Sequence, residues 1–243
     1  MSAPILVRRR LEPTASRARL LLEAVSEVES IEEGQLPPAH LAAHALAAIR
    51  QDAPGFKPER VVIQVKGIGH DHLPTRVAGI VAPVDVTHAR ACARVVQRSG
   101  RVLEIEAHGK FVERRDAPPH PVPGKLAAFA RAVDLAPRDY SRLEAWPVDY
   151  IVALCAAGVE AENENEGGLA KLIRLNVELV SDGPILTSLR LSIDGIRPVS
   201  GDMARVVFRV TSGAGRLVAR GDALIVSALA HSCAMAIPLR FVA

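Results

Sequence analysis

The sequence predicts an α+β protein of two related halves, in which each half packs an antiparallel sheet on an alanine-rich helix. The first observation is a short echo: Ala93-Arg94-Val95-Val96 recurs as Ala204-Arg205-Val206-Val207, and Ala107-x-Gly109 recurs as Ala219-x-Gly221. The second is that each copy has two β-rich stretches around a glycine turn and follows an alanine-rich helical stretch. The third is that the connections of the second half are too short for parallel crossovers. We therefore expect one β-unit to occur twice in a single body.

The composition is typical of a globular protein without membrane spans. The chain has 243 residues, of which 49% are hydrophobic, so it can bury a substantial core as one large domain or two small ones. Charged residues make up 23%, and no apolar run reaches the length of a membrane-spanning helix. The run Arg8-Arg9-Arg10 is not followed by the apolar stretch of a secretory signal, so a cytoplasmic location is expected.

Charge, aromatic content and cysteine spacing argue against several kinds of partner. The formal net charge is +3, but the arginines alternate with acidic residues, and aromatic residues make up only 3%. Nucleic-acid binding is therefore not expected. Cys92, Cys155 and Cys233 are far apart among small apolar residues, which predicts reduced thiols and no structural metal site. The chain also lacks a Gly-Lys-Ser/Thr phosphate loop and a Gly-x-Ser-x-Gly nucleophile elbow, so no cofactor is predicted.

Two helices are predicted before the first strands. Apolar residues at spacings of three and four predict an amphipathic helix over residues 18–32. Pro37-Pro38 predicts the start of an alanine-rich helix over residues 39–51, because proline is tolerated in a first helical turn. Pro54-Gly55 predicts the end of that helix.

Runs of β-branched residues predict the strands of the first half. Residues 61–65 and 77–81 are such runs on either side of a loop over 67–75. A strand pair around Ser99-Gly100 completes this half.

Prolines between Asp116 and Val122 lack the N–H donors that a strand needs, so this stretch is the expected boundary between the halves. Beyond it we expect a short helix over 125–133, an alanine-rich helix over 147–162 and a polar loop over 162–168. The later strands are predicted at 172–180, 186–193, 204–211, 217–226 and 235–242. The expected domains are a helical segment at 1–36, a first half at 37–116, a linker with a short helix at 117–140 and a second half at 141–243.

Three stretches of the second half resemble the sheet of the hot-dog fold: Ile196 to Asp202, Ala204 to Val210 and Gly215 to Val226. In that family a curved antiparallel sheet wraps around one central helix. The resemblance covers residues 149–226 directly, and residues 39–112 through the echo. It implies a double hot-dog in which each half has a curved sheet.

The resemblance also implies an activity. Members of the family are mostly thioesterases and hydroxyacyl dehydratases that act on coenzyme A or carrier-protein thioesters, and they share no sequence motif. In the double hot-dog dehydratases a histidine of the first half faces an aspartate on the helix of the second. By position, Asp149 resembles that aspartate, and His70 or His72 is the possible partner. The implied partners are a small acyl thioester or an acyl carrier protein, with a homo-oligomer possible.

The chemistry of such a pair is reasonable. A neutral imidazole can take the acidic proton beside a thioester carbonyl, and a carboxyl group in a dry tunnel can protonate the leaving hydroxyl. An aspartate after a proline in the first turn of a helix is also typical of a capping residue. Both readings of Asp149 stay open at the level of sequence.

The histidines and the sheet allow two further readings. His70 and His72 lie on one side of an extended segment, so they could bind a metal ion together with His88, His108 or His120. A noncatalytic binding or assembly protein that dimerises through its sheet would carry the same patterns. His40 and His44 lie one helical turn apart and share a helix face, which is compatible with packing, surface exposure or ligation.

Overall fold

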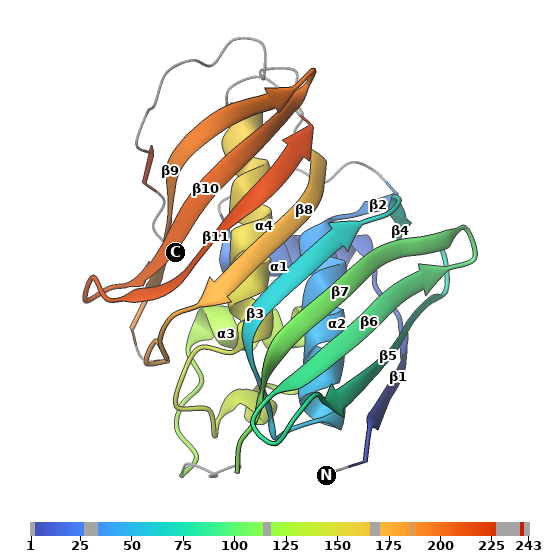
Figure 1. Ribbon diagram of the computed structural model, residues 1–243, viewed down its shortest axis with the longest axis vertical. Helices are drawn as coiled ribbons and strands as arrows, with labels where there is room; N and C mark the ends of the chain where they lie inside the picture. Colours follow the sequence, from blue (N-terminus) through green and yellow to red (C-terminus); the bar gives the residue numbers. More distant parts are fainter. Residues whose placement is uncertain are drawn as a thin grey trace.

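A computed structural model describes residues 3–26, 34–113, 118–165, 171–185, 187–226 and 239–240, apart from the side chains of 162–165 and 239–240. Within these residues ten strands form one antiparallel sheet (Figure 1). Their spatial order is β1 (Ile5–Leu11), β5 (Thr75–Pro83), β6 (Ala89–Gln97), β7 (Gly100–Phe111), β3 (Phe56–Val65), β8 (Lys171–Leu179), β11 (Leu217–Val226), β10 (Met203–Ser212), β9 (Leu189–Ser200) and β12 (Leu239–Arg240). A small second sheet pairs β2 (Gln35–Leu36) with β4 (Gly69–His70). The predicted α+β class with antiparallel sheets is confirmed.

The two halves of the large sheet have the same strand order. The order β5-β6-β7-β3 in the first half corresponds to β9-β10-β11-β8 in the second, and β3 pairs with β8 to join the halves. The echoed sequences lie on corresponding strands, with residues 93–96 on β6 and 204–207 on β10. The two Ala-x-Gly copies likewise lie on β7 and β11. The predicted arrangement of two related halves is thus present in the topology.

A close approach of neighbouring strands explains the glycine in both Ala-x-Gly copies. A Cβ atom on Gly109 would lie 2.0 Å from the carbonyl oxygen of Lys57 on β3. A Cβ atom on Gly221 would lie 2.0 Å from the carbonyl oxygen of Asn176 on β8. Both distances are far below van der Waals contact, so no side chain fits at either position.

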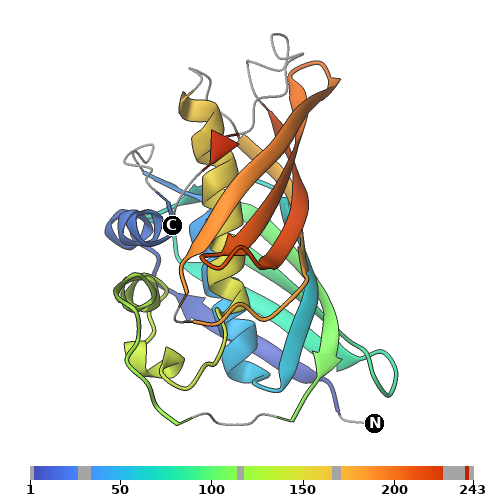
Figure 2. The same cartoon turned by 90° about the vertical axis from the view of Figure 1, so that its left-hand side faces the viewer.

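The helices form two layers on one side of the sheet. The central helices α2 (Pro38–Asp52) and α4 (Val148–Asn165) pack on each other and lie within the curve of the sheet (Figures 1 and 2). The outer helices α1 (Ala15–Val25) and α3 (Gly124–Ala132) pack together and cover them on the far side (Figure 2). A short 3-10 helix, η1 (Pro137–Tyr140), follows α3.

The alanine content of α2 explains how this helix fits between the sheet and the outer helices. Every residue from Ala39 to Ile49 is buried, because small side chains let the helix pack closely on all sides. The helices predicted over 39–51 and 125–133 are confirmed as α2 and α3. None of the described helices is long and apolar enough to cross a membrane.

The structure corrects several predicted boundaries. The helix predicted over 18–32 begins earlier, at Ala15, and ends at Val25, because the backbone of Ser26 is extended (φ −148°, ψ 170°). Residues 27–32 of that prediction lie outside the described part. Residues Ile5–Leu11, expected to belong to a helical segment, form strand β1 and pair with β5. The first residues of the loop expected over 162–168 are helical, since α4 continues to Asn165, and residues 166–168 lie outside the described part.

The remaining strands are present where they were predicted, but β3 begins five residues earlier than expected and β9 ends seven residues later. The short strand β4 lies within the loop expected over 67–75. The strand predicted at the chain end, 235–242, is described only at Leu239–Arg240, and its other residues lie outside the described part.

Candidate functional site

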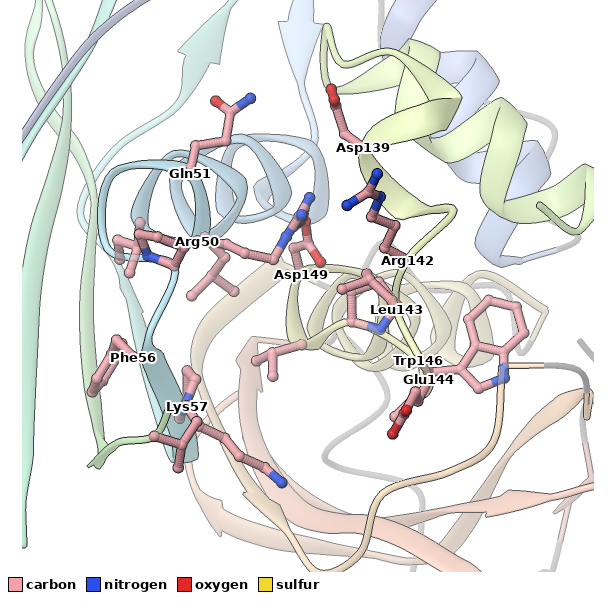
Figure 3. A pocket seen from close by; sticks show the side chains of 18 of the residues that line it. Arg50, Gln51, Phe56, Lys57, Asp139, Arg142, Leu143, Glu144, Trp146 and Asp149 are labelled. Atoms are coloured by element: carbon pink, nitrogen blue, oxygen red, sulfur yellow. Dashed lines mark hydrogen bonds and ion pairs between the residues drawn. The ribbon is translucent and has the colours of Figure 1, made fainter. Parts of the chain in front are cut away.

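A cavity of about 890 Å³ opens where the two central helices meet (Figure 3). Its walls come from the end of α2, the start of α4, the start of β3 and the segment 138–147. Apolar side chains on these walls are Leu46, Ile49, Phe56, Leu143, Trp146 and Val148. Charged side chains such as Lys57, Arg138 and Glu144 line it as well. The cavity is therefore large enough for a small ligand, and its mixed lining can contact both a hydrocarbon chain and polar groups.

Asp149 lies at the inner end of this cavity, in the first turn of α4. Its Oδ2 atom accepts a hydrogen bond from the Tyr140 hydroxyl at 2.9 Å. The same oxygen accepts from Arg50 Nη2 at 3.3 Å and from Arg50 Nε at 3.4 Å. Its Oδ1 atom accepts from the backbone N–H of Tyr150 at 3.2 Å. Asp149 thus bonds within its own helix and also to two residues from other elements.

Arg50 and Tyr140 form the charged surroundings of Asp149. The Arg50 guanidinium lies 4.3 Å from the centre of the Tyr140 ring, a cation–π distance. Burial lowers the pKa of Arg50, but the attraction and hydrogen bonds of Asp149 and Tyr140 together outweigh it, and the net pKa is raised. Burial first, and then Asp149, raise the pKa of Tyr140 well above its usual value. Arg50 therefore stays cationic and Tyr140 stays a hydroxyl donor at neutral pH.

The start of α4 adds a positive electrostatic environment. Pro147 precedes the helix, and its carbonyl oxygen accepts the N–H groups of Tyr150 and Ile151 at 3.1 Å each. The N–H groups of Val148 and Asp149 belong to the first turn, where no intrahelical acceptor exists. The partial positive charge of these groups favours an anion or a developing negative charge at this end of the helix.

Trp146 fixes one wall of the cavity. Its ring centre lies 4.5 Å from that of Tyr150, and its Nε1 atom donates to the carbonyl oxygen of Thr187 at 2.7 Å. The backbone N–H of Trp146 also donates to Gly183 at 2.9 Å. This side chain is therefore held in place from two directions.

The structure does not bring His70 or His72 to Asp149. His70 lies on β4 near the N-terminus of α2, where a Cβ atom on the adjacent Gly69 would touch Leu41. Asp149 contacts Arg50 near the other end of α2, and the helix rises about 14 Å between Leu41 and Arg50. The predicted site residues are thus at opposite ends of one helix.

The remaining histidines of the metal hypothesis are dispersed. His72 has an exposed side chain, and its ring centre lies 5.5 Å from that of His70. His88 bonds to Asp85, His108 bonds to Glu106, and His120 bonds to backbone carbonyl groups. No group of three His, Cys, Asp or Glu side chains that could hold a metal ion occurs in the described part of the chain.

His40 and His44 form a buried pair on α2. Their Nε2 atoms lie 3.1 Å apart, and His40 Nε2 lies 3.2 Å from the carbonyl oxygen of Ala132 on α3. Burial lowers the pKa of His40 to about 4. Burial first, and then the neighbouring His40, lower the pKa of His44 well below its usual value. Both rings are therefore neutral at pH 7. Of packing, surface exposure and metal ligation, the structure supports packing as the role of this pair.

Two residues of the site were not predicted from the sequence. Arg50 was visible only as a basic residue in the last turn of a predicted helix, and Tyr140 as one residue of a linker. Arg50 and Asp149 are 99 positions apart in the chain, and no local pattern relates residues at such a separation.

Comparison with known proteins identifies the fold. No family model matches the chain, and no curated protein is detectably similar to it in sequence. Among solved structures, it is similar to a tesB protein of Mycobacterium avium subsp. paratuberculosis, with 16% identity, a TM-score of 0.59, and 82% of this chain and 89% of that one covered.

Two further solved structures are similar. One is HtdX of Mycobacterium tuberculosis, with 10% identity, a TM-score of 0.61, and 90% of this chain and 98% of that one covered. The other is a 12:0-ACP thioesterase of Umbellularia californica, with 9% identity, a TM-score of 0.58, and 91% of this chain and 94% of that one covered. The predicted hot-dog fold of the thioesterase type is therefore confirmed, at identities that speak to the fold alone.

Proposed function

We propose that this protein binds acyl thioesters in the cavity at the start of α4 and hydrolyses them, with Asp149 as the catalytic carboxylate. The observation that carries the proposal is the carboxylate itself, held by Arg50 and Tyr140 at the inner end of a cavity whose walls carry both apolar and charged side chains. The fold supports it, because solved structures with the same fold include a 12:0-ACP thioesterase. The acyl group can come from coenzyme A or from a carrier protein, since both present the same thioester.

The proposed reaction is general-base hydrolysis. The Asp149 carboxylate takes a proton from a water molecule, whose oxygen attacks the thioester carbonyl carbon. The carbonyl oxygen becomes an oxyanion, and the free N–H groups of the first turn of α4 are the donors proposed to stabilise it. The C–S bond then breaks, the thiolate leaves, and it regains a proton from Asp149 or solvent. The products are a carboxylic acid and a thiol.

Arg50 and Tyr140 are positioning residues in this proposal. Both bond to Oδ2 of Asp149, so they fix the rotamer of the carboxylate and leave Oδ1 with only the Tyr150 N–H. An oxygen with one donor retains a lone pair for a water proton.

A second candidate function is thioester binding without turnover. The Asp149 side chain is only 1% exposed, and each of its oxygens already accepts a hydrogen bond. Such a carboxylate is also what a purely structural ion pair requires. In that case the cavity would hold an acyl thioester, and Asp149 would only join α4 to α2.

Turnover of an acyl-coenzyme A panel by three variants separates these functions. Asp149→Asn should lower thioester hydrolysis by at least about a hundredfold, the usual scale for loss of a general base. Tyr140→Phe removes one donor from Oδ2 and should lower it by a smaller factor. His108→Gln, on the outer face of β7, is the control and should leave it unchanged.

The outcomes are distinct once folding is verified by circular dichroism. Full activity in folded Asp149→Asn would reject the catalytic role. Binding of acyl-coenzyme A without turnover in the wild type would favour the second candidate. Neither His70 nor His72 reaches Asp149 in this arrangement, so His72→Gln should keep its activity, and a loss of activity would favour the predicted histidine–aspartate pair instead.

A further inference from the structure

A proline-rich segment, residues 118–123, runs between the first half and α3, and we call it the strap. Proline has no backbone N–H, so only His120 and Val122 in the strap can donate from the main chain. The N–H of His120 donates to the carbonyl oxygen of Ser141 at 2.8 Å. His120 is therefore the residue that ties the strap to the segment leading into the cavity wall.

The imidazole of His120 adds a second connection to that segment and one contact within the strap. Its Nε2 atom lies 2.6 Å from the carbonyl oxygen of Leu143, and its Nδ1 atom lies 3.0 Å from that of Pro121. A carbonyl oxygen only accepts hydrogen bonds, so both ring nitrogens must carry a hydrogen for both bonds to form. That state is the imidazolium ion. In the neutral ring one nitrogen would direct its lone pair at a carbonyl oxygen.

The anchored segment is a wall of the cavity. Residues 142–149 all line it, and Leu143, whose carbonyl oxygen His120 holds, is near the start of that run. The run has other attachments: the N–H of Leu143 donates to Tyr140 at 3.2 Å, and Trp146 donates to Gly183 and Thr187. Leu143 is only three residues from Trp146, so a shift of Leu143 changes the surroundings of the Trp146 ring.

We propose that the strap is a pH-sensitive fastening of the cavity wall, in which protonated His120 holds Leu143 in place and deprotonation of His120 loosens it. The consequence of this inference rests on the proposed function. Acyl thioesters should bind more weakly as the pH rises and His120 loses its proton. A wall that is already ordered costs less to organise around a ligand.

The direction of the pH effect follows from the surroundings of the ring. The carbonyl groups of Pro121 and then Leu143 raise the pKa of His120 above 6.5, and desolvation opposes them only in part. The stabilisation is thus complete below pH 6.5 and is lost as the pH rises through the raised pKa. The charged side chains on η1 and on the wall are Arg138, Asp139, Arg142 and Glu144, and the causes of the shift are the two carbonyl groups and desolvation.

The fluorescence of Trp146 tests the fastening without any ligand. It is the only tryptophan in the chain, and it lies on the same wall. In a titration of the free protein from pH 5.5 to 9, the emission of the wild type should change with a midpoint above 6.5. His120→Gln keeps a side-chain donor but does not titrate, so the change should disappear. His108→Gln, an exposed histidine on β7, should retain it.

Ligand binding at two pH values is the second test of the proposal. The affinity of the wild type for a long-chain acyl-coenzyme A should fall about threefold between pH 6 and 8.5, a modest factor because the ring is near the surface. The affinity of His120→Gln should vary less. An unchanged fluorescence titration in His120→Gln, or none in the wild type, would overturn the fastening. A normal titration with no thioester binding at either pH would leave the fastening intact and reject the proposed function instead.

Discussion

Acidification should destabilise the folded protein through His40, which is buried on α2 with its ring against α3. Burial lowers the pKa of His40 from 6.5 to about 4, and its Nδ1 atom has no hydrogen-bond partner in the described structure. The unfolded chain therefore binds a proton at a higher pH than the folded protein does. The stability contributed by the neutral ring is complete above pH 6.5, declines as the pH falls, and is lost at about pH 4.

The size of this effect follows from the two pKa values. The full shift, from 6.5 to about 4, corresponds to about 3 kcal/mol at 1.36 kcal/mol for each pH unit. Between pH 7.5 and pH 4.5 most of that amount, about 2.5 kcal/mol, should be lost. Urea unfolding followed by circular dichroism at these two pH values measures the free energy of unfolding directly.

A variant isolates the histidine from the carboxylates, which also titrate in this range. His40→Gln keeps a donor for the Ala132 carbonyl oxygen but cannot gain a proton. Its loss of stability between the two pH values should be smaller than that of the wild type by about 2.5 kcal/mol. His108→Gln, on the sheet surface, should lose as much as the wild type. An equal loss in His40→Gln and the wild type would refute the reasoning.

Three further predictions concern the fold and the site. Gly109→Ala and Gly221→Ala should each lower the free energy of unfolding by more than about 2 kcal/mol, since each Cβ would meet a carbonyl oxygen of the neighbouring strand, and urea unfolding checks this. Burial raises the pKa of the Cys155 thiol, so peptide mapping after maleimide treatment at pH 7 should find Cys92 labelled and Cys155 unlabelled. Arg50→Gln leaves the buried Asp149 carboxylate without its cation and should lower the thermal midpoint by several degrees.

Each of these predictions has an outcome that would contradict it. Native stability in either glycine variant would show that the strands can separate at that point. Rapid labelling of Cys155 in the folded protein would show that α4 is less closely packed than described. An unchanged midpoint in Arg50→Gln would mean that the ion pair with Asp149 adds nothing to the join between α2 and α4.

Local signals in the sequence were enough to predict most of the helices and strands. Pro37-Pro38 and Pro54-Gly55 mark α2 within one residue at its start, because proline and glycine restrict the backbone directly. The Ala-x-Gly copies predicted the relation between the halves, and the structure gives the physical reason in Gly109 and Gly221. These are features in which a residue constrains its own neighbourhood.

Features that depend on distant partners could not be predicted in this way. Arg8, Arg9 and Arg10 make β1 look like a polar terminus, although charged residues are common on an edge strand. The position of Asp149 was predicted from the resemblance, but Arg50 and Tyr140 meet it only because α2, η1 and α4 converge. The sequence analysis paired His70 with Asp149, but the length of α2 separates these two residues.

A single-turnover experiment with enzyme in excess over a radiolabelled long-chain acyl-coenzyme A tests the central claim most directly, because it separates binding from hydrolysis. The account predicts that wild-type protein binds the thioester and releases labelled fatty acid, and that folded Asp149→Asn binds it and releases at least about a hundredfold less in the same time. Equal rates of release in the two proteins would contradict the assignment of Asp149 as the catalytic carboxylate.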